Sequence, residues 1–108
     1  MLEAVAKMFR SRPSAKMEAF VRQVADESVA DVAQLVANHM EGMTLSEARG
    51  YVRARSAQIV RRRTRLAINR NPNAAPNWSA LIVRRATERL VPFVLRQTSF
   101  GIPRRAAA

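Results

Sequence analysis

The chain has 108 residues, of which 48% are hydrophobic, and its formal net charge is +11 at pH 7. This length suits one domain with a modest core, and three glycines leave too few turn residues for a β-sandwich. The absence of cysteine excludes disulfides and thiol catalysis, and no apolar run approaches the roughly 20 residues of a membrane-spanning helix. No secretory signal is visible near Met1, so we expect a cytoplasmic location.

The charge is divided unequally along the chain. Residues 1–43 are nearly neutral, with five basic and six acidic groups, whereas residues 44–108 carry fourteen arginines against Glu47 and Glu88. Such a split is expected when one half builds a scaffold and the other meets a partner. A GC-rich genome would explain the excess of arginine over lysine, but it would not explain the missing acids.

The first predicted element is a short amphipathic helix from Leu2 to Phe9. Val5, Met8 and Phe9 fall on its apolar side. A break follows, and Ser14 is the expected N-cap of the next helix.

A long helix is predicted next, from about Ala15 to Met40, with Gly42 in the C′ position that ends it. Its apolar positions recur at helical spacing: Met17, Phe20, Val21, Val24, Val32, Leu35, Val36 and Met40. Three acidic residues are expected to form a solvated far side: Asp26, Glu27 and Asp31. His39 has no second histidine or cysteine to share a metal with, so we expect a capping or surface role.

The third predicted helix spans Thr44 to Arg70 and carries eight arginines against one glutamate. Thr44 and Glu47 have the spacing of a capping box. A narrow apolar stripe recurs every seven residues beside Ala48: Leu45, Val52, Ile59 and Leu66. Gly50 weakens the helix, and the arginines surround its axis rather than lining one side.

A turn-rich linker at residues 71–77 precedes the last helix, which is predicted from Trp78 to about Thr98 with Asn77 as its N-cap. Its apolar stripe contains Ile82, Val83, Ala86, Leu90, Phe93 and Val94. The opposite side holds Arg84, Arg85, Glu88, Arg89 and Arg96. Pro92 predicts a kink or an early end, and residues 101–108 are expected to form a frayed basic tail.

Together these elements predict an all-α fold in one domain over residues 1–108. It is a small bundle of three longer helices plus the short N-terminal helix. Because the connections are only a few residues long, neighbouring helices should run antiparallel.

The sequence offers little support for catalysis. It contains no glycine-rich phosphate loop, and no Ser-His-Asp set has supporting context. We therefore expect a protein that is not an enzyme and that needs neither a cofactor nor a metal.

Nucleic-acid binding through the phosphate backbone is the leading functional interpretation, because guanidinium groups bind phosphate bidentately and release condensed counterions. The candidate DNA- or RNA-binding residues are Arg53, Arg55, Arg61, Arg62, Arg63, Arg65, Arg70, Arg84, Arg85 and Arg89. A helix-turn-helix is not indicated, since no turn divides residues 44–63. Aromatic residues that could stack on bases are few.

Two other kinds of partner fit the same charge. The main alternative is a protein–protein interaction subunit, which docks its arginine-rich helices on an acidic partner or larger assembly. A thin apolar stripe could also be completed by a second copy in a homo-oligomer. An anionic membrane surface is the least favoured partner, suggested only by the amphipathic last helix with its Trp78 and Phe93.

Overall fold

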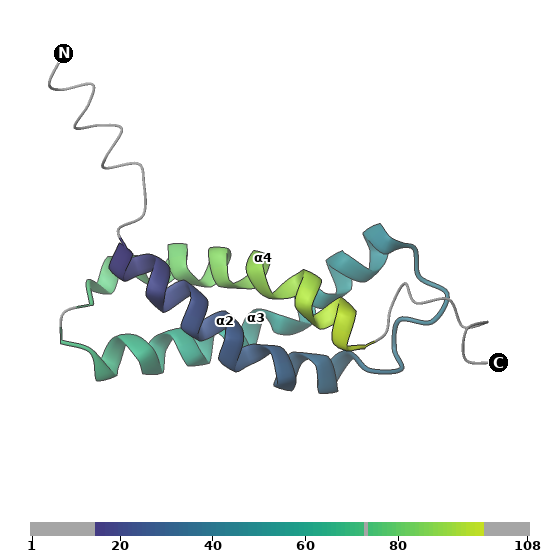
Figure 1. Cartoon of the computed structure of the whole chain (residues 1–108), viewed down its shortest axis with the longest axis horizontal. Coiled ribbons are helices and arrows are strands. Elements are labelled where there is room, and N and C mark those ends of the chain that lie inside the picture. The colour runs from purple at the N-terminus through teal and green to yellow at the C-terminus, as the bar shows by residue number, and fades with distance from the viewer. Residues whose placement is uncertain (1–14, 73, 99–108) are drawn as a thin grey trace, which may run out of the picture.

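Three long helices make up the computed structural model, which describes residues 15–72 and 74–98. They are α2 (Ala15–Val36), α3 (Leu45–Arg70) and α4 (Ser79–Gln97), and a short 3-10 helix, η1 (Pro76–Trp78), leads into α4. The helices alternate in direction, and each pair is in contact (Figure 1). The all-α prediction with three longer helices is confirmed, and the described residues contain no strand.

Several predictions concern residues outside the described ranges. These are the helix from Leu2 to Phe9, the N-cap at Ser14 and the tail at residues 101–108. Within residues 15–72 and 74–98, no helix combines the length and the apolar character needed to cross a lipid bilayer.

Helix α2 ends at Val36, four residues before the predicted end at Met40. Asn38 adopts the left-handed conformation, with φ of +68°, and asparagine is one of the few residues that ends a helix this way. Gly42, predicted to end the helix, instead has φ of +81° in a turn where the Met43 amide donates to the Met40 carbonyl at 3.1 Å. Met40 is still buried, because the turn returns it to the core.

The predicted capping box at the start of α3 is confirmed. The Glu47 amide donates to Thr44 Oγ1 at 3.1 Å, and the Thr44 amide donates to Glu47 Oε1 at 2.8 Å. At the other end, Asn71 Nδ2 donates to the Ala67 carbonyl at 2.7 Å, which satisfies one of the carbonyls left open by the end of the helix. Local side-chain chemistry therefore sets both ends of α3.

The buried face of α3 differs from the predicted seven-residue stripe. Leu45 and Leu66 are 49% and 45% exposed. The residues that are buried follow mainly a four-residue spacing: Ala48, Val52, Ser56, Val60, Thr64 and Ala67. Four residues turn through about 400°, so this stripe winds around the axis and can face both neighbouring helices in turn. Its small side chains allow those helices to approach closely.

Helix α4 also buries residues at four-residue spacing: Ile82, Ala86, Leu90 and Val94, together with Val91 and Leu95. Phe93, predicted in the stripe, is 40% exposed. The predicted N-cap at Asn77 is wrong, because η1 places Trp78 at the N-cap position, where it makes no side-chain capping bond. Pro92 does not end the helix, which continues to Gln97.

Candidate nucleic-acid interface

Three of the ten predicted arginines form ion pairs with carboxylates on neighbouring helices. Arg53 of α3 binds Glu88 of α4. Arg63 of α3 binds Asp31 of α2, and Arg85 of α4 binds Glu18 of α2 at 3.0 Å. Each pair of helices is thus linked by one ion pair among the described residues, and these arginines have a partner within the fold.

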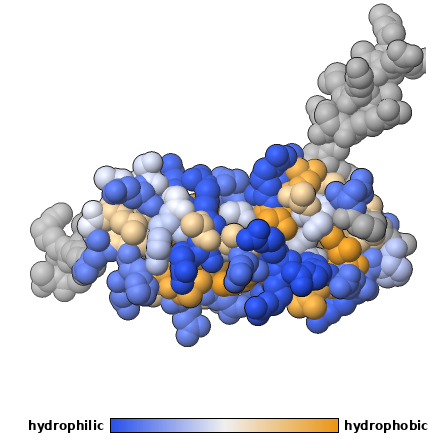
Figure 2. Space-filling model, turned by 180° about the vertical axis from the view of Figure 1, so that it is seen from behind, coloured by the Kyte–Doolittle hydropathy of each residue, from blue (hydrophilic) through white to orange (hydrophobic). Residues whose placement is uncertain are grey.

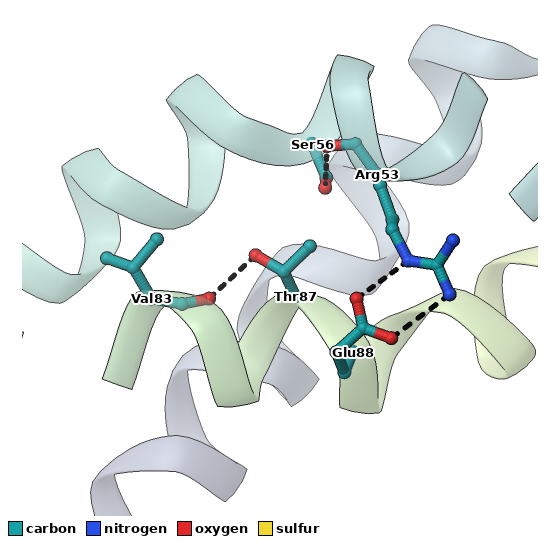
Figure 3. Close-up of polar contacts among 5 residues, drawn as sticks. All are labelled: Arg53, Ser56, Val83, Thr87 and Glu88. Carbon is teal, nitrogen blue, oxygen red and sulfur yellow. Dashed lines mark hydrogen bonds and ion pairs between the residues drawn. The ribbon is translucent and has the colours of Figure 1, made fainter. Parts of the chain in front are cut away.

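The pair between Arg53 and Glu88 has two hydrogen bonds (Figure 3). Arg53 Nε donates to Glu88 Oε2 at 2.7 Å, and Arg53 Nη2 donates to Glu88 Oε1 at 3.1 Å. The hydrogen bond to Glu88 and then its negative charge raise the pKa of Arg53 above its ordinary value. This fork holds the Arg53 guanidinium against α4.

The other seven predicted arginines make no ion pair with an aspartate or glutamate of residues 15–72 and 74–98. All seven are exposed: Arg55, Arg61, Arg62, Arg65, Arg70, Arg84 and Arg89. The fold therefore divides the predicted site into arginines with an internal partner and arginines that remain available to an external anion.

Five exposed polar residues form a continuous line along α3, which we call the outer strip: Arg55, Gln58, Arg62, Arg65 and Asn69. They follow one another at steps of three or four residues, so they share one face of the helix. Arg62 lies about 200° around the axis from Val60 and from Thr64, both of which are fully buried, so this face points away from the core.

The outer strip is uniformly cationic or neutral. It carries three guanidinium groups and two amides, and α3 contains no acidic residue after Glu47. Arg61 lies one turn from Arg65 and adds a fourth exposed guanidinium at its edge. At about 1.5 Å per residue, the strip rises about 21 Å from Arg55 to Asn69.

The arginines of α4 occupy a different part of the surface. Arg84, Arg85 and Arg89 line a shallow hollow of about 430 Å³ together with Glu18, Val21 and Glu88. All six lining residues belong to α2 or α4, and none belongs to α3. The hollow mixes both signs of charge, so the predicted second row of arginines does not extend the outer strip.

Sequence reasoning did not single out Gln58 and Asn69. Their spacing in the sequence could have identified them, because both lie three or four residues from an arginine of the outer strip.

Figure 2 shows hydrophilic side chains over much of one face of the molecule, with hydrophobic groups exposed between them. This mixture is consistent with the exposure of Leu35, Leu45, Leu66 and Phe93.

The described residues offer no alternative metal centre, since no group of three His, Asp or Glu side chains among them could hold an ion. His39 is exposed in the turn after α2.

Comparison with protein-family models, with curated proteins and with solved structures finds no match to this chain. The geometry and charge of the outer strip are therefore the features that bear on function.

Proposed function

We propose that this protein is a non-enzymatic nucleic-acid-binding protein that contacts mainly the phosphate backbone through the outer strip of α3. The observation that supports this is the set of exposed guanidinium groups of Arg55, Arg62 and Arg65, aligned on one face with no carboxylate among them. Phosphate oxygens supply the counter-charge that the fold does not.

The physical chemistry of the strip suits this role. A guanidinium group can donate two parallel hydrogen bonds to one phosphate, and each phosphate neutralised on duplex DNA releases condensed counterions. Because the strip lies on a helix packed against both neighbours, its backbone is already ordered before binding. Binding then has to order only the arginine side chains.

A charge-reversal experiment tests the proposal. The double variant Arg62→Glu with Arg65→Glu should abolish retardation of DNA or RNA at low salt. Its matched control is Lys16→Glu with Arg22→Glu, which changes two exposed cations of α2 and lowers the net charge equally. The control should retain most binding, and circular dichroism should report unchanged helicity for both. Equal losses from the two variants would count against the outer strip.

An acidic protein surface is a second candidate partner, favoured by Leu66. This residue is 45% exposed and lies one helical turn from both Arg62 and Arg70, so an acidic partner could cover apolar and charged groups together. A stoichiometric complex that survives nuclease treatment and requires Leu66 would support this candidate. Loss of the copurifying partner on nuclease treatment would support nucleic-acid binding.

A further inference from the structure

The spacing of the strip arginines carries the proposed function one step further. Resting on that function, we infer that the outer strip recognises a double helix rather than a single strand. Helix α3 lies across one groove, with Arg55 on one phosphate row and Arg62 and Arg65 on the other. Duplex DNA and duplex RNA are both candidate ligands, because each presents two rows of backbone phosphates, one on either side of a groove.

The spacing of Arg55 and Arg62 is close to the width of a groove. Arg55 and Arg62 share a face and are separated by about 10.5 Å along the axis. The major groove of B-form DNA is about 12 Å wide. A helix that crosses the groove can therefore place Arg55 at one border and Arg62 at the other, with Gln58 over the space between them. Arg61 and Arg65 lie within one turn of Arg62 and join its phosphate row.

The helix that carries the outer strip is rigid. Helix α3 runs through 26 residues, and its inner face is fixed by buried residues against α2 and α4. Val52 and Val60, which flank Arg55 and Gln58 along the chain, are fully buried. The helix backbone therefore fixes the axial spacing from Arg55 to Arg62. A flexible single strand has to lose conformational freedom to match this spacing. A double helix presents phosphates at fixed positions and matches a fixed spacing.

The placement of aromatic side chains also favours a double helix over a single strand. Single-strand binding commonly uses exposed rings on which successive bases stack. Within the described part of the chain, the only aromatic residue of α3 is Tyr51, which is half-buried against the core. Trp78 packs edge-on against Phe20 with ring centroids 5.9 Å apart, and the Arg96 guanidinium lies 4.7 Å from the Phe93 ring centroid. The outer strip itself therefore offers no base-stacking platform.

Fluorescence anisotropy with labelled oligonucleotides tests the inference on the full chain. The probes are a duplex DNA of about 20 base pairs, the matching duplex RNA, and the single strands of each. We expect at least about tenfold tighter binding to one or both duplexes than to the single strands, with a slope of log affinity against log salt of about −2.7 to −3.6 on DNA for three or four phosphates. The two duplex arms identify which double helix is the ligand.

Moving one arginine along α3 without changing the net charge distinguishes two explanations for a duplex preference. One is groove bridging, in which Arg55 and Arg62 contact phosphates on opposite sides of a groove, and the other is simple attraction to the denser charge of a duplex. Arg55→Ala combined with Gln58→Arg keeps the number of arginines but shortens the spacing to Arg62 to about 6 Å. Groove bridging predicts that the slope on the preferred duplex becomes shallower by about 0.9, as one phosphate contact is lost. Circular dichroism should show intact helicity in this variant.

The outcomes are distinguishable. Single strands that bind as tightly as the duplexes, or a relocated variant with the parent's duplex slope, would overturn the double-helix inference while leaving the proposed function intact. Failure of every probe to bind at low salt would overturn the proposed function itself.

Discussion

Arg53 and Glu88 join the antiparallel helices α3 and α4 through two hydrogen bonds, although 35 residues separate them in sequence. One of the only two acidic residues in the arginine-rich half is thereby used within the fold. The same relationship assigns Arg53 to the packing of the bundle and leaves Arg62, exposed on the outer face, for an external anion. Equal formal charges therefore have different expected roles on one helix.

The first prediction compares these two arginines. Arg62→Ala should make the salt dependence of nucleic-acid affinity shallower by about 0.9, because one phosphate contact is lost. Arg53→Ala removes the same charge but should leave that slope unchanged, since Arg53 already contacts Glu88. Affinity titrations at several salt concentrations measure both slopes. Identical changes would show that position on α3 is irrelevant and that only net charge matters.

The second prediction compares two leucines. Leu90→Ala should lower the free energy of unfolding by about 2–5 kcal/mol, because it opens a cavity at a fully buried site. Leu66→Ala should lower it by less than about 1 kcal/mol, since Leu66 is 45% exposed. Urea unfolding followed by circular dichroism gives both values. A loss at Leu66 as large as that at Leu90 would restore the seven-residue stripe as the buried face of α3.

Much of the fold could be predicted because its signals are local. The capping box lies within four residues of sequence, and the apolar spacing identifies each long helix. The prediction that the seven-residue stripe is the buried face of α3 was wrong, because burial depends on how the helices pack together. The crossing of α2 and α4 over α3 selects Val60 and Thr64 for burial, and helical spacing alone cannot distinguish them from Ile59 and Leu66.

The candidate site was less predictable for the same reason. Arginines on α3 were expected all round the axis, but their partners depend on which helix lies alongside. Asp31 is 32 residues from Arg63, and Glu18 is 67 residues from Arg85. Only the packed bundle identifies these pairs, and hence which arginines remain for the outer strip.

The third prediction concerns the buried hydroxyl of Thr64. Its Oγ1 has no hydrogen-bond partner among the described residues, and the side chain is fully buried. Thr64→Val keeps the shape and removes this unsatisfied group, so it should stabilise the fold by about 1 kcal/mol. The matched control is Thr87→Val, because Thr87 Oγ1 donates to the Val83 carbonyl at 2.7 Å (Figure 3). Thermal unfolding should show a gain for the first variant and no gain for the second.

The last prediction compares two glycines that become alanine. Gly50 lies inside α3, exposed, and a Cβ built there meets nothing within 4 Å. Gly50→Ala should therefore raise the free energy of unfolding by about 1 kcal/mol, since alanine loses less backbone freedom on folding. Gly42 has equal space around it but φ of +81°, so Gly42→Ala should lower stability by about 1–2 kcal/mol.

Thermal unfolding followed by circular dichroism measures both effects, with a shift of about 4–8 °C expected for each kcal/mol in a domain of this size. Because neither added methyl meets a neighbour, the opposite signs must come from the backbone. Stabilisation by Gly42→Ala would contradict the left-handed turn between α2 and α3. Destabilisation by Gly50→Ala would contradict a helix that runs without interruption from Leu45 through Gly50.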